Sequence, residues 1–186
     1  MAIKLVKMDA KDLKPDIAYS IIRGLEDHLF NHKELSKEDV TTIIANQDED
    51  GSFRLFTGQW CHDSDVILDV DYRVTYLCTL LLINSDESEA SLSSIDKAFD
   101  YIRKRGLAGK GYDAVSDEID NVTMFLEHGL IPFIDKHHPR YNKFFNFIDV
   151  LIYDYKTWYD KGKVTVGWGE DVTDKIKHIL DLFNRI

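Results

Sequence analysis

The stretch at residues 43–53 combines the end of a predicted helix with a sharp change of chain direction. An apolar helical face reaches Ile43, and Gln47 follows at the expected helix end. A glutamine side chain can bond the unpaired carbonyl groups of its own helix end or the unpaired N–H groups of a neighbouring helix. Gly51 allows a positive φ, and Phe53 can fold back to pack. This order of residues predicts a junction that fixes how two helices meet.

Apolar residues at helical spacing continue through most of the chain and predict an all-α fold of about seven helices, arranged as αα-hairpins in a single domain of residues 1–186. The third helix is apolar nearly all round and is expected to lie deep. Ser36, Ser94 and Ser116 are expected to cap the second, fourth and fifth helices. A solvated loop at 85–94 precedes the fourth. The predicted helices span residues 15–32, 36–47, 69–84, 95–106, 116–133, 139–159 and 172–183.

The charge and the apolar runs exclude several partners. A net charge of −10 weighs against nucleic acid, because that interface needs a basic stripe. The longest apolar run, residues 76–83, is far shorter than the ~20 residues that span a bilayer, so no membrane span is expected. Cys61 and Cys78 form no Cys-x-x-Cys pair, which indicates neither a disulfide framework nor a cysteine-rich zinc module. A cytoplasmic location is the simplest expectation.

The spacing within residues 43–53 is an aliphatic run, Gln, three residues, Gly, one residue and an aromatic. It resembles the QW motif of the α/α-toroid proteins, the prenyltransferase and terpene-cyclase-like family. The resemblance covers mainly residues 36–126 and implies a shortened toroid. A closed toroid uses about five to seven hairpins of roughly 50 residues, and this chain has room for about three to four. We therefore expect it to close differently, add a partner or pair with itself as a homodimer, because open ends would expose apolar faces.

A partial catalytic motif follows at the matching place. Class II terpene cyclases carry Asp-x-Asp-Asp near the start of an inner helix, and this chain has Asp69, Val70, Asp71 and Tyr72 there. The resemblance implies that Asp71 is the Brønsted acid and that Asp69 helps to keep it protonated, because a second carboxylate raises the pKa. Tyr72 departs from the motif. The alternative is that both aspartates satisfy N–H groups at a helix start.

A polar cluster at residues 60–65 is the other candidate site. Cys61, His62 and Asp65 are residue types that bind zinc, but they lack a recurrent ligand spacing, and the Asp-x-Cys pair of the protein prenyltransferases is absent. The alternative is a polar loop without metal, and we expect no metal or cofactor. The residues expected to gather near the mouth of a ligand cavity are Trp60, His62, Asp69, Asp71 and Tyr72. The residues expected to bind the ligand are Trp60, His62, Tyr72 and Tyr76.

Three functions remain open at this point. The favoured hypothesis is a diverged, non-catalytic binding module whose concave face takes an apolar small molecule or a protein segment. An isoprenoid-type cyclase or prenyltransferase-like enzyme that uses Asp71 as its acid is the alternative. The third is an acidic protein-interaction domain that meets a basic partner. The sequence leaves open whether the protein is an enzyme.

Overall fold

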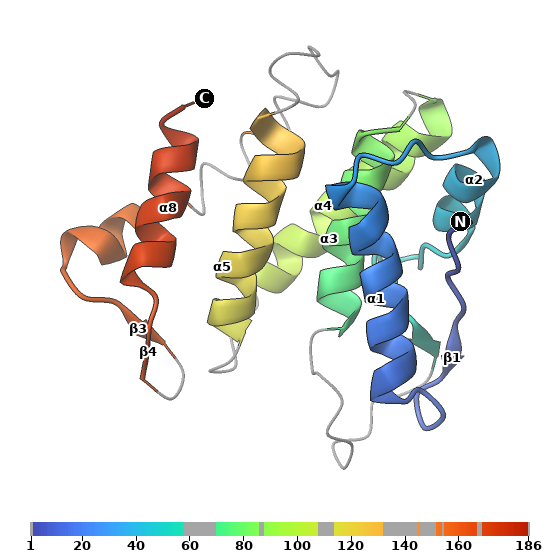
Figure 1. The fold of residues 1–186 in the computed structure, drawn as a ribbon, viewed down its shortest axis with the longest axis horizontal. Coiled ribbons are helices and arrows are strands. Elements are labelled where there is room, and N and C mark those ends of the chain that lie inside the picture. Colours follow the sequence, from blue (N-terminus) through green and yellow to red (C-terminus); the bar gives the residue numbers. More distant parts are fainter. Residues whose placement is uncertain are drawn as a thin grey trace. The chain divides into compact units, whose positions relative to one another are not determined.

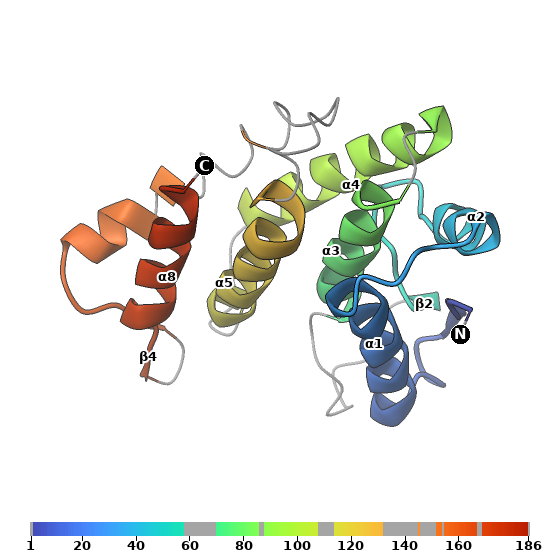
Figure 2. The ribbon, with the colours of Figure 1, turned by 45° about the horizontal axis from the view of Figure 1, so that its top comes forward.

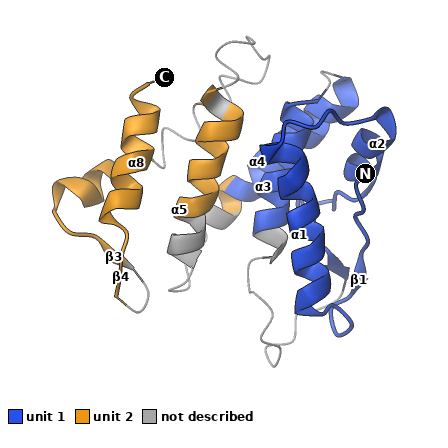
Figure 3. Ribbon diagram, viewed as in Figure 1, with its two compact units in different colours: residues 1–102 blue, residues 103–186 orange. Residues whose placement is uncertain are grey.

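A computed structural model describes residues 2–57, 70–85, 88–107, 114–131, 145, 152–153, 155–166 and 169–185. The prediction of an all-α fold is confirmed, because the described residues are mostly helical and their strands are only two residues long. The chain divides into two compact units, residues 1–102 and 103–186 (Figure 3), and each is described by itself. The prediction of a single domain stays a prediction.

The first unit is built around helix α3 (Val70–Ile83), which is buried from Val74 to Ile83 as its all-round apolar sequence predicts. Helix α1 (Pro15–Phe30) lies beside α3, and α2 (Lys37–Ala45) also packs on it (Figures 1 and 2). Strands β1 (Met8–Asp9) and β2 (Phe56–Thr57) form a two-residue parallel pair. Helix α4 (Glu89–Leu107) begins in this unit and ends in the second.

The starts of α1 and α2 agree with the sequence. Pro15 opens α1, where its missing N–H costs nothing, and the buried face of α1 includes Leu25 and Leu29. Ser36 caps α2: its hydroxyl accepts the N–H of Asp39 at 3.1 Å, and the Asp39 carboxylate accepts the Ser36 N–H at 3.1 Å. This reciprocal capping box satisfies two N–H groups that the helix itself cannot pair.

The junction after α2 ties the helix end to α4. Gln47 Nε2 donates to the Gly51 carbonyl at 3.1 Å and to the Ser94 carbonyl at 2.8 Å, and the Ser94 hydroxyl donates to Gln47 Oε1 at 2.8 Å. Phe53 is buried, and its N–H donates to the Thr75 hydroxyl at 3.0 Å. Gln47 therefore connects its own turn with a neighbouring helix, although it reaches carbonyl and hydroxyl groups there rather than N–H groups.

Replacing Gln47 by alanine is expected to lower the free energy of unfolding of the first unit by about 1–2 kcal/mol, because three part-buried hydrogen bonds are lost. Urea denaturation followed by circular dichroism measures this. Glu49→Ala, at an exposed position of the same turn, serves as the control and is expected to change stability by less than about 0.5 kcal/mol. Equal effects of the two substitutions would contradict a role for the Gln47 side chain.

Two of the predicted serine caps are wrong. Helix α4 begins at Glu89, so Ser94 lies inside the helix, where it is buried and bound to Gln47. Ser88 takes the capping position, and its hydroxyl accepts the Ser91 N–H at 3.3 Å. Helix α5 (Ala114–Phe125) likewise begins before Ser116. In α4, burial of Ser91, Leu92 and Ser94 favours helix before the predicted start, and a serine pattern alone does not indicate burial.

The second unit packs α5 against α8 (Thr173–Phe183). After α5 the helix widens into a π-helical turn, η1 (Leu126–Leu130), and strands β3 (Thr165–Val166) and β4 (Glu170–Asp171) pair antiparallel before α8. Residues 152–153 and 155–160 are also helical. The predicted sixth helix lies largely outside the described residues. The buried side chains of this unit include Ile119, Val122, Phe125, Val172, Ile176 and Ile179.

Candidate functional site

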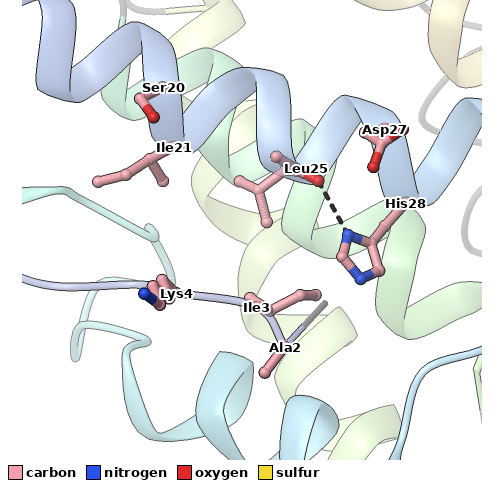
Figure 4. Close-up of a pocket in the computed structure, with 9 residues that line it drawn as sticks. Ala2, Ile3, Lys4, Ser20, Ile21, Leu25, Asp27 and His28 are labelled. Carbon is pink, nitrogen blue, oxygen red and sulfur yellow. Dashed lines mark hydrogen bonds between the residues drawn. The ribbon is translucent and has the colours of Figure 1, made fainter.

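The N-terminal groove is a cavity of about 270 Å³ between residues 2–4 and helix α1 (Figure 4). Ile21, Leu25 and the His28 ring point from α1 toward the extended N-terminal segment. The walls are mostly apolar, with polar groups toward the ends. The residues that line the groove are Ala2, Ile3, Lys4, Ser20, Ile21, Gly24, Leu25, Asp27 and His28.

Gly24 leaves an opening in the α1 wall of the groove. It stands ten residues into a 16-residue helix, where glycine costs roughly 0.5–1 kcal/mol relative to alanine. Apart from its chain neighbours and the α1 backbone around it, no atom of the described residues lies within 4 Å of the position that a Cβ would occupy at Gly24. Packing inside the described protein therefore does not require glycine here, and its effect is to widen the groove.

His28 supplies a buried polar group at one end. Its Nδ1 lies 2.9 Å from the Gly24 carbonyl oxygen. Because a carbonyl oxygen only accepts, Nδ1 carries a proton, and in the neutral form of the ring Nε2 is an acceptor. Among the described residues Nε2 has no hydrogen-bond partner, although the ring interacts electrostatically with Asp27 and Asp39.

Asp39 holds the N-terminal segment in place. Its carboxylate is buried and accepts the Ile3 N–H at 2.7 Å, the Ser36 hydroxyl at 2.7 Å and the Ser36 N–H at 3.1 Å. Burial would raise the pKa of Asp39, but these hydrogen bonds outweigh it, so the pKa lies below its ordinary value. Ile3 and Leu5 are buried, and Lys7 pairs with Asp48. These contacts hold the second wall of the groove against the rest of the first unit.

The net charge of the chain lies entirely in the part that carries the groove. Residues 1–102 contain 10 Lys and Arg against 20 Asp and Glu, whereas residues 103–186 contain 13 of each. A field of this sign attracts cationic partners and repels anionic ones.

Most of the site residues expected from the sequence lie outside the described part of the chain. Tyr76 is fully buried in α3. Asp71 and Tyr72 lie in the first turn of α3, and their side chains are outside the description, so the proposed acid stays a prediction. The remaining residues that fall outside the described ranges are Trp60, Cys61, His62, Asp65 and Asp69.

The described ranges offer neither a metal-binding cluster nor a reactive thiol. Within them, no three His, Cys, Asp or Glu side chains come together to hold a metal ion. Cys78 is buried in α3, and burial raises the pKa of its thiol, which keeps it in the inert thiol form. Every helix in these ranges is too short or too polar to cross a bilayer.

The sequence patterns did not identify the groove, because it joins segments that are far apart in the chain. One local signal was present: Gly24 interrupts a well-formed helical pattern without ending it. No family model matches the chain, and no curated protein or solved structure matches it.

Proposed function

We propose that the protein is a non-catalytic binding module whose N-terminal groove takes an apolar group of its ligand. The observation that carries this proposal is Gly24, whose missing side chain keeps space open against apolar walls at a cost to helix stability. Burying one aliphatic or aromatic group there would contribute about 1.5–3 kcal/mol.

The size of the groove favours a small group over an isoprenoid substrate. Small-molecule sites usually enclose about 300–1,000 Å³, and a cavity of roughly 150 Å³ holds benzene. At about 270 Å³ the groove suits one ring or one branched aliphatic group. The carboxyl groups of Asp27, in the lining, and Asp39, behind it, do not favour acid catalysis, because hydrogen bonds hold the pKa of each below its ordinary value.

The toroid-like architecture, a cytoplasmic location and a protein partner remain part of the same proposal. The bonds from Gln47 to Gly51 and Ser94 support a QW-like role for this glutamine. The acidic first unit supports a cationic partner.

Toluene is expected to bind in the N-terminal groove with a dissociation constant on the order of 1 mM. A titration followed by methyl NMR tests this, and the signals of Ile3, Ile21 and Leu25 should shift in a saturable way. Ile179, in the core of the second unit, should not shift. Gly24→Met should fill the space and abolish binding without harming α1, because methionine forms helices better than glycine.

Gly24→Ala is the matched control, since it adds one methyl group and leaves most of the space. It should retain weakened binding of toluene. Absence of saturable shifts in the wild-type protein, or equal shifts in Gly24→Met, would overturn the proposed function.

A further inference from the structure

We propose that the N-terminal groove binds an extended, basic peptide, which adds as a strand to residues 4–6 and places one apolar side chain against Gly24. This inference rests on the proposed function and names its ligand. It follows from the backbone of the N-terminal segment, from the open space beside that backbone, and from the charge of the first unit.

The backbone of the N-terminal segment has an unused strand edge. The Ile3 N–H points to Asp39, which belongs to α2. Because successive residues of an extended chain point their N–H groups to opposite sides, Lys4 and Val6 point theirs away from α2. Within the described chain, the N–H and carbonyl groups of residues 4–6 make no hydrogen bond. The N–H and carbonyl groups of Lys4 and Val6 therefore form a strand edge on the side away from α2, and Lys4 also lines the groove.

Farther along the chain, at β1, the same backbone edge already pairs with strand β2. Residues 4, 6, 8 and 10 share one side of an extended chain, and the N–H groups of Met8 and Ala10 donate to the carbonyls of Leu55 and Thr57 at 2.9 and 3.0 Å. The β2 strand does not continue along residues 4–6, because the N–H of Phe53 turns to Thr75 in α3. A peptide strand would extend the existing pairing where β2 leaves it, which is the recognition mode of strand addition.

The space beside this edge fits a side chain. Ile21 and Leu25 line it with apolar surface, and Gly24 leaves the opening between them. An extended peptide presents alternate side chains to one face, so one apolar residue can enter while its neighbours stay in solvent. A small apolar molecule would fill the space but would leave the backbone edge unused.

The net charge of the first unit indicates which charge the peptide residues beside the apolar anchor should carry. The groove lining itself has Lys4 at one end and Asp27 beside His28 at the other, and Asp27 is paired with Lys33. The first unit carries 10 cationic and 20 anionic side chains, so its long-range field favours a basic peptide. In the neutral form of the ring, His28 Nε2 can accept a hydrogen bond from a donor side chain of that peptide.

The test uses the full chain and the peptide acetyl-Lys-Thr-Lys-Leu-Lys-Thr-Lys-amide. On binding, the amide signals of residues 4–6 should shift and gain protection from hydrogen exchange, together with shifts of the Ile21 and Leu25 methyl groups. The same peptide N-methylated at alternate residues should bind at least tenfold more weakly, because it lacks the paired N–H groups. Glu in place of each Lys should also weaken binding at least tenfold at low salt.

The outcomes separate the two proposals. Saturable binding of toluene without binding of the peptide would overturn strand addition and leave the proposed function standing. Equal binding of the peptide and its N-methylated form would also overturn strand addition. Failure of both toluene and the peptide would overturn both proposals. Loss of peptide binding in Gly24→Met, with binding retained in Gly24→Ala, would support the apolar anchor.

Discussion

Replacing Gly51 by alanine is expected to lower the free energy of unfolding of the first unit by about 2–5 kcal/mol. Gly51 has φ +94°, a conformation in which an L side chain costs roughly 1–2 kcal/mol. A Cβ there would lie against the Lys97 carbonyl oxygen and 2.6 Å from the Lys97 carbonyl carbon. Because these are backbone atoms of α4, the helix itself must shift, and such overpacking costs a further ~1–3 kcal/mol.

Gly162 provides a matched control for this substitution. It has a similar φ of +104°, but apart from its chain neighbours no atom of the described residues lies within 4 Å of its Cβ position. Gly162→Ala should therefore cost only the roughly 1–2 kcal/mol of backbone strain. Urea denaturation and hydrogen exchange measure both variants. An equal loss in the two would mean that the close approach of Gly51 to α4 contributes nothing.

The junction around Gly51 could be predicted because its chemistry is local. Gln47, Gly51 and Phe53 are within seven residues of one another, and a helix end, a positive φ and a returning aromatic each have a sequence signature. The cap at Ser36 is local in the same sense. The hydrogen-bond partner of Gln47 in α4 could not be predicted in this way, because Ser94 is 47 residues away and no local pattern selects it.

The groove could not be predicted from the sequence. Its walls come from residues 2–4 and from α1, and its support comes from Asp39 in α2. Asp39 reads in the sequence as an ordinary first-turn acid, which is indeed one of its roles. Its second role, as the acceptor for the Ile3 N–H, depends on a contact between residues 36 positions apart. Only the tertiary structure brings these groups together.

Asp39→Ala is expected to lower the free energy of unfolding of the first unit by about 2–4 kcal/mol. The substitution removes half of the capping box, which is worth about 1 kcal/mol, and leaves the buried Ile3 N–H without its acceptor, which costs about 1–3 kcal/mol. Hydrogen exchange of the Ile3 amide should accelerate with the global loss. Glu38→Ala, at the exposed neighbouring position, is the control and should change stability by less than about 0.5 kcal/mol.

The contribution of the Asp39 charge has a defined dependence on pH. Folding lowers the pKa of Asp39, so the stability it contributes is fully present above its ordinary value of 3.8 and is lost as the pH falls through the lower value of the folded protein. The stability difference between the wild-type protein and Asp39→Asn should therefore be constant near neutral pH and shrink below 3.8. Urea denaturation at several pH values measures it. A difference that stayed constant down to about pH 2 would mean that the hydrogen bonds, and not the negative charge, hold the N-terminal wall of the groove.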